Sequence, residues 1–140
     1  LDLQSELHKT IIFITHDLDE ALKIGDRIAI LRDGSMVQDS DPQEIIMNPA
    51  DEYVSDFIKD INRARVIQAK SIMTPTNSKS SGATVKEEMV LEDILQIMSD
   101  APSKPVTIEN SKGKITGKIE MVNLIEGMKR PKSLGTNITG

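Results

Sequence analysis

His16 is the residue of this chain that is best placed to do chemistry. It follows directly on the apolar run Ile11–Thr15, in the stretch TIIFITHDLDEA, and a helix-start signal comes immediately after it. Proteins of the α/β class hold their ligands in the crevice outside the carboxyl ends of buried strands. The pattern therefore predicts a ligand site at the end of a strand, with His16 at its centre.

Three carboxylates come directly after His16, namely Asp17, Asp19 and Glu20. A cluster of this kind is compatible with a bound metal ion. Asp17 and Glu20 have the spacing of a helix capping box, however, and carboxylates in a first turn also stabilise the helix dipole. We therefore expect these side chains to begin a helix, and we expect no metal site.

The patterning on either side of His16 predicts the elements that must position it. The continuous β-branched and aromatic run Ile11–Thr15 is typical of a strand that is buried on both faces. Spacing of leucines predicts a helix over about residues 1–8. After His16 we expect a helix over residues 17–24 with Gly25 at its C′ position.

A hairpin and two helices are expected next. Asp33-Gly34 is a strong signal for a two-residue turn, here between strands at residues 27–32 and 36–38. Asp41 and Pro42 have the order typical of a helix start, and this short helix should end near Asn48. A further helix over residues 51–61 would turn one apolar face to the core, made of Val54, Phe57, Ile58 and Ile61.

Residues 74–84 are rich in Ser, Thr, Pro and Gly and predict a loop before a second region. In that region Leu91, Ile94, Leu95 and Met98 have the spacing of a helix face. The expected elements are a strand at 84–85, a helix at 88–100, a strand at 106–108, a turn at 110–113, a strand at 115–121 and a helix at 122–128. A flexible tail is expected over residues 131–140.

The composition excludes several classes of function. The net charge of −5 argues against a nucleic-acid partner, because phosphate binding requires clustered Lys and Arg. The absence of cysteine excludes disulfides, zinc–thiolate sites and thiol nucleophiles. The longest apolar run is far shorter than the roughly 20 residues that span a bilayer.

The first region, over about Leu1–Asp60, resembles the C-terminal end of an ABC transporter ATP-binding subunit of the glycine betaine/proline type. The resemblance rests on the strand–histidine–DLDEA run, on Gly25-Asp26-Arg27-Ile28-Ala29, on the Asp-Gly hairpin and on Asn48-Pro49-Ala50, in this order. It implies that His16 corresponds to the switch histidine, which contacts the γ-phosphate of ATP and helps to position the attacking water at a dimer interface.

The second region, over about Ala69–Arg130, resembles a cystathionine-β-synthase (CBS) regulatory domain. The residues that carry the resemblance are Ile72-Met73-Thr74-Pro75, the helix 91–98, Pro105-Val106 and the stretch from Gly117 to Leu124. In betaine-type transporter ATPases such domains follow the nucleotide-binding domain, and the order here agrees. The sequence therefore predicts an α/β (α+β) chain: a C-terminal remnant of an ABC ATPase domain at 1–62, and a single CBS-like unit at 69–130.

The CBS resemblance also implies two cofactor-binding positions. Nucleotide-binding members carry a Ser or Thr and then an Asp at the places of Glu120 and Asn123. Glu120 would put a negative charge near a phosphate, and Asn123 is a weaker ribose partner than Asp. We therefore favour an interaction and dimerisation module over a site for AMP or ATP.

Taken together, the resemblances imply a fragment of the ATP-binding subunit of an importer for glycine betaine, proline or a related compatible solute. The intact parent would use ATP and Mg, would sit in the cytoplasm at the inner face of the membrane, and would partner a transmembrane permease. The chain contains no GxxxxGK[ST] phosphate loop, so we do not expect it to hydrolyse ATP alone.

Two other hypotheses stay open. In one, the chain is a stand-alone CBS-type module that binds an adenine nucleotide, with the first region helping it to assemble. In the other, it is a truncated reading frame without an independent function. A single CBS-like unit exposes the face that would normally pack on a second copy, so we predict a homodimer through that unit.

Overall fold

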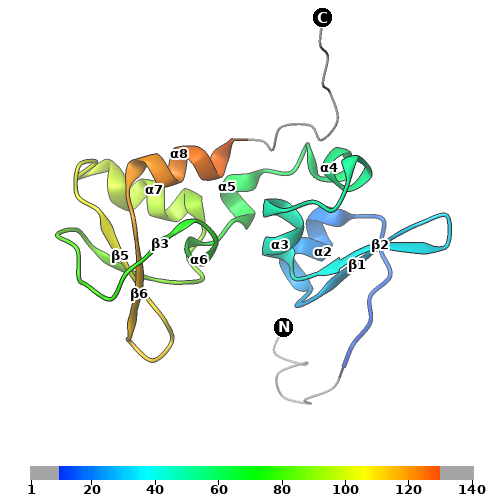
Figure 1. Cartoon of the computed structure of the whole chain (residues 1–140), viewed down its shortest axis with the longest axis horizontal. Coiled ribbons are helices and arrows are strands. Elements are labelled where there is room, and N and C mark those ends of the chain that lie inside the picture. Colours follow the sequence, from blue (N-terminus) through cyan, green and yellow to red (C-terminus); the bar gives the residue numbers. More distant parts are fainter. Residues whose placement is uncertain (1–9, 130–140) are drawn as a thin grey trace, which may run out of the picture. The chain divides into compact units, whose positions relative to one another are not determined.

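The computed structural model describes residues 10–129, which form two compact units (Figure 1). The first comprises residues 10–61 and the second residues 62–129, and each has its own apolar core. The fold is mixed α and β, as predicted. The helix expected over residues 1–8 and the tail expected over 131–140 lie outside the described residues.

The first unit consists of a helix, a β-hairpin and two short helices. Its elements are α2 (Leu18–Ile24), β1 (Ile28–Arg32), β2 (Ser35–Ser40), α3 (Pro42–Met47) and α4 (Glu52–Ile58). Apolar side chains from all of these elements except β2 are buried together; they are Leu22, Ile28, Ile30, Ile45, Ile46, Val54 and Ile58. The two strands form an antiparallel sheet of their own.

The hairpin between β1 and β2 has the predicted turn. Asp33 and Gly34 have φ angles of 51° and 79°, and two successive positive φ angles define the I′ turn, whose twist matches that of the paired strands. The register shifts by one residue after Ile30, where β2 contains a bulge. The prediction of an Asp-Gly hairpin is thus confirmed.

All three helices of the first unit begin at an aspartate. The carboxylates of Asp17, Asp41 and Asp51 each accept a hydrogen bond from the backbone N–H three residues later, at 3.2, 2.9 and 2.9 Å. Pro42 occupies the first turn of α3, where a backbone N–H would have no partner within the helix, so proline loses no hydrogen bond. These contacts confirm the predicted helix starts, including the capping role of Asp17.

The strand predicted over Ile11–Thr15 is wrong: this segment has no regular secondary structure. Its apolar side chains are exposed, Ile12 to 85% and Ile14 to 96%. A strand exists only where a neighbouring strand takes up its backbone hydrogen bonds. Within residues 10–61 the two strands β1 and β2 pair with each other, and neither pairs with this segment.

Three smaller predictions for the first unit are also wrong. Gly25 does not adopt the left-handed conformation of a C′ glycine, because its φ is −74°. A glycine fits here because a Cβ would lie only 3.0 Å from the carbonyl oxygen of Ala21. Helix α4 ends at Ile58 and not at Ile61. The Ile61 N–H donates a hydrogen bond to the carbonyl oxygen of Ile58 at 3.1 Å. Phe57 is 44% exposed and packs on Tyr53, with ring centroids 6.0 Å apart.

The second unit is a four-stranded sheet with helices packed on it. Its elements are α5 (Arg63–Val66), α6 (Ala69–Ile72), β3 (Thr74–Pro75), β4 (Thr84–Lys86), α7 (Leu91–Ser99), β5 (Val106–Glu109), β6 (Ile115–Ile119) and α8 (Met121–Met128). The strand order is β3-β6-β5-β4, with β4 and β5 parallel and the other pairs antiparallel. Helices α7 and α8 lie together on one side of this sheet (Figure 1).

The strands and helices at 84–128 confirm the predicted order, with ends shifted by a few residues. The two one-turn helices α5 and α6 were not predicted, because four residues are too few to show a periodic pattern. The start of the expected loop at 74–84 is in fact β3, which pairs with β6.

Two glycines of the second unit allow close packing. A Cβ on Gly117, in β6, would lie 2.5 Å from the sulfur of Met73. A Cβ on Gly127, in α8, would lie 3.0 Å from Ile72 and 3.1 Å from Leu91. Helix α8 therefore approaches α6 and α7 so closely that Ile72 and Leu91 would have to shift to admit a Cβ at Gly127.

Candidate functional site

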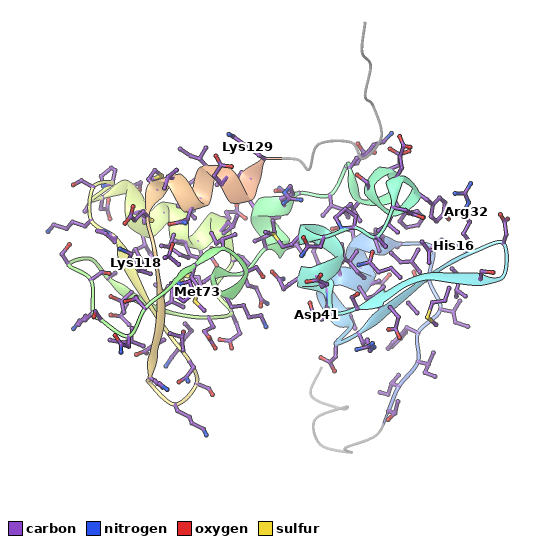
Figure 2. All side chains as sticks on the ribbon, viewed as in Figure 1. His16, Arg32, Asp41, Met73, Lys118 and Lys129 are labelled. Atoms are coloured by element: carbon purple, nitrogen blue, oxygen red, sulfur yellow. The ribbon has the colours of Figure 1, made fainter. Side chains whose placement is uncertain are left out.

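His16 lies between the exposed segment Ile11–Thr15 and helix α2 (Figure 2). The backbone N–H of Asp17 donates a hydrogen bond to the Thr15 hydroxyl at 3.0 Å, and this turn directs the chain from the segment into the helix. The His16 side chain is exposed, and among residues 10–129 it makes no hydrogen bond or ion pair. Imidazole donates and accepts hydrogen bonds near neutral pH, so His16 is available to a ligand that approaches from outside this unit.

The carboxylates beside His16 have local partners. Asp17 caps α2, and Asp19 lies 3.8 Å from the Lys23 ammonium one turn later. Within the part of the chain that the structure describes, no three His, Asp or Glu side chains come close enough to hold a metal ion. The acidic residues after His16 thus stabilise the helix on which the histidine depends.

Glu120 and Asn123 lie together at the start of α8, in the second unit. The side-chain carbonyl of Asn123 accepts a hydrogen bond from the Glu120 backbone N–H at 2.7 Å. The Glu120 carboxylate lies 3.4 Å from the ammonium of Lys118, at the end of β6. Figure 2 shows Lys118 on this strand, close to the helix start.

These contacts give both residues a structural role that sequence reasoning missed. Asn123 ties down the first turn of α8, and Glu120 forms a half-exposed ion pair. An exposed ion pair contributes little to stability, typically below about 1 kcal/mol, so Lys118 and Glu120 can exchange partners easily. The assignment of the two residues to a nucleotide cleft stays a prediction.

Arg63 is a further residue that the sequence did not single out. Its Nε donates a hydrogen bond to the carbonyl oxygen of Gly127, in the last turn of α8, at 3.1 Å. Burial lowers the pKa of the Arg63 guanidinium from its ordinary value, although an arginine remains charged at neutral pH. A single arginine in a short helix shows no sequence pattern, so only the fold reveals the contact.

No family model matches the chain, whereas several curated proteins are similar to it. The glycine betaine/carnitine transport ATP-binding protein GbuA of Listeria monocytogenes is 60% identical over 73 residues, which are 52% of this chain and 18% of that protein. The trimethylamine N-oxide transport system ATP-binding protein TmoW of Pelagibacter ubique is 39% identical over 127 residues, 89% of this chain and 37% of the relative.

A third relative matches almost the whole chain. The choline transport ATP-binding protein OpuBA of Bacillus subtilis is 33% identical over 139 residues, which are 97% of this chain but 35% of that protein. The chain therefore spans between 18% and 37% of the length of these relatives. No helix among residues 10–129 is both long and apolar enough to cross a membrane. The homologues of this chain are thus ATP-binding proteins of transport systems for glycine betaine, carnitine, choline and trimethylamine N-oxide, and the chain corresponds to a part of them.

Proposed function

We propose that the chain is the C-terminal part of the ATP-binding subunit of an ABC importer for glycine betaine or a related compatible solute. Residues 1–62 would supply the switch histidine, His16, and residues 69–130 would form a regulatory CBS-like unit. The observation that carries this proposal is that matches to transport ATP-binding proteins run through both units, over 89% and 97% of the chain.

The geometry of the first unit is compatible with this role. His16 is exposed at the end of an apolar segment whose strand partners are not among residues 10–61. Hydrolysis of ATP requires a glycine-rich loop, a lysine and a Mg²⁺ ligand to neutralise the transferred phosphate, and one histidine does not replace them. His16 would therefore act only together with these groups from the rest of the parent subunit.

A chimera tests the proposal. Residues 1–140 would replace the matching segment of OpuBA, a relative whose match covers 97% of the chain, and the hybrid would be reconstituted with the transmembrane permease of that system. We expect ATP hydrolysis and choline uptake in the hybrid, and a loss of hydrolysis by about 100-fold in its His16→Ala variant, which is the usual effect of losing one group that stabilises developing charge. His8→Ala changes the other histidine of the chain and serves as the matched control.

Two outcomes would contradict the proposal. One is a hybrid subunit that assembles with the permease but hydrolyses no ATP. The other is a His16→Ala hybrid that is as active as the His8→Ala control.

The second unit would act as a homodimer, through the face made by α7 and α8. Three large apolar side chains are exposed on these two contacting helices: Leu95 to 38%, Val122 to 55% and Ile125 to 52%. Burying this surface in a second copy is favourable at about 25 cal/mol for each Å² of apolar area. No charged side chain has to be removed from water at these three positions.

Sedimentation of the 140-residue chain tests this pairing. We expect dimers at micromolar concentration, and monomers for Val122→Lys combined with Ile125→Lys. Leu31→Lys is a matched control, because Leu31 is 59% exposed on the hairpin of the first unit. A monomeric unmodified chain, or equal dimerisation of all variants, would contradict the proposed homodimer.

Calorimetry with AMP, ADP and ATP separates this proposal from the alternative of a stand-alone nucleotide-binding module. AMP binding that disappears in Asn123→Ala would favour the alternative. Because Asn123 already bonds the Glu120 backbone, the variant must first be shown by circular dichroism to keep its helices.

A further inference from the structure

Helix α5 is the first element of the second unit, and it is attached to both long helices of that unit. Arg63 Nε donates to the Gly127 carbonyl oxygen in the last turn of α8 at 3.1 Å. Arg65 Nε lies 3.5 Å from the Glu92 carboxylate in the first turn of α7. The chain enters α5 directly after the boundary between the units, which falls between Ile61 and Asn62.

The contact between Arg63 and α8 has little freedom to slide. Gly127 is buried, and the space that a Cβ would need is already occupied by Ile72 and Leu91. A cation at the carboxyl end of a helix is favoured by the helix dipole, and a charged donor makes a strong hydrogen bond. Close-packed interiors transmit a displacement rather than absorb it.

The opposite end of α8 carries the candidate residues. Asn123 and Glu120 hold its first turn, and α8 has eight residues, so it is about 12 Å long. One short, rigid helix thus has the Glu120–Asn123 contact at its start and the Arg63 contact at its end.

We propose that α8 and Arg63 form a relay that couples the start of α8 to α5. A displacement of the first turn of α8 shifts the Gly127 carbonyl, and the hydrogen bond from Arg63 passes this shift to α5, through which the chain enters the second unit. This inference rests on the proposed regulatory role of the second unit, and it names the residues by which that role is carried out.

Hydrogen exchange in the 140-residue chain tests the relay by a double-mutant cycle. Asn123→Ala removes one of the two side-chain bonds of the capping box at the first turn of α8. The reporters are the Arg65 and Ile67 amides, which bond to the carbonyls of Asn62 and Arg63 at 3.1 and 2.9 Å. Losing a helix cap costs about 1 kcal/mol, so we expect exchange at these amides to rise about fivefold.

The relay predicts that this response disappears when Arg63 is changed. In an Arg63→Gln background, Asn123→Ala should add no further acceleration at Arg65 and Ile67. Arg65→Gln is the matched control, since it removes the other arginine contact of α5 and should leave the response to Asn123→Ala intact. Arg63→Lys serves as a second background if Arg63→Gln does not fold, and it should weaken the response.

Two results would overturn the relay. One is equal acceleration by Asn123→Ala with and without Arg63, and the other is an acceleration that stays within the first turn of α8. The test measures the chain alone and needs no transport. A failed chimera with an intact relay would therefore contradict the proposed function, whereas an active chimera without the relay would contradict only this inference.

Discussion

Thr107 is the one polar side chain of the described residues that is fully buried, in the middle of β5. The Thr107 hydroxyl accepts a hydrogen bond from the Ser80 backbone N–H at 2.8 Å. The backbone N–H of Thr107 donates a hydrogen bond to the Ala83 carbonyl. Thr107 therefore ties the long loop before β4 to the sheet, and the Gly82 N–H adds a bond to the Pro105 carbonyl at 3.0 Å. A buried hydroxyl is tolerated because it is hydrogen-bonded.

We expect Thr107→Val to reduce the free energy of unfolding by about 1–3 kcal/mol. Valine has the same shape, so the loss comes from leaving the Ser80 N–H without its acceptor. Urea unfolding measures the change, and hydrogen exchange at Ser80 locates it. Thr107→Ser keeps the hydroxyl and should leave Ser80 protected; loss of protection in that variant would show that the hydroxyl is not what holds the loop.

The elements of the second unit depend on how closely they approach one another. Met73 follows α6 and packs directly over Gly117 of β6. On the neighbouring residue of β6, the Thr116 hydroxyl donates a hydrogen bond to the Glu87 carboxylate at 3.0 Å. The pairing of Thr74 with Lys118 brings β3 onto β6 at the same place. A glycine inside β6 is thus required by contact between elements, since a strand by itself gains nothing from glycine.

Gly117→Ala should destabilise the second unit by about 1–3 kcal/mol, because the added methyl overlaps the sulfur and Cγ of Met73. Removing those atoms with Met73→Ala should relieve part of the loss. The double variant is then more stable than the two single changes predict, by about 1 kcal/mol in urea unfolding. Additive effects would mean that the two residues do not share this space.

At the scale of the whole chain, the two units differ in charge and in what they expose. Residues 10–61 contain 12 Asp and Glu against 4 Lys and Arg, whereas residues 62–129 contain 8 against 10. The acidic unit also carries the four consecutive exposed apolar side chains of Ile11–Ile14. Exposed β-branched segments with unsatisfied backbone groups promote aggregation.

We expect Ile12→Lys combined with Ile14→Lys to raise the concentration at which the chain stays soluble. The free energy of unfolding should change by less than about 0.5 kcal/mol, as is usual for exposed positions. Static light scattering and urea unfolding measure the two effects. Ile46→Lys is the buried counterpart and should unfold the first unit. Unfolding by the change at Ile12 and Ile14 would instead mean that the segment is packed.

Much of the local structure was predicted from short-range chemistry. The aspartate caps at Asp17 and Asp41, the Asp-Gly turn and the apolar face of α7 each depend on residues within a few positions of one another. The candidate site was predicted less completely. His16 was identified from its place after an apolar run and Asn123 by resemblance, yet the bond from the Glu120 backbone to Asn123 and the ion pair with Lys118 became visible only in the structure.

The sequence by itself therefore determined the helix starts, the hairpin, the mixed α and β fold and the resemblance to transport ATP-binding subunits. The tertiary structure decided that Ile11–Thr15 is not a strand, that Gly117 and Gly127 are sites of close approach, and that Arg63 bonds the end of α8. The reason is physical: a cap or a turn is completed by its neighbours in the chain, whereas a strand pairing, a packed glycine or a distant hydrogen bond requires a partner that the fold alone brings near.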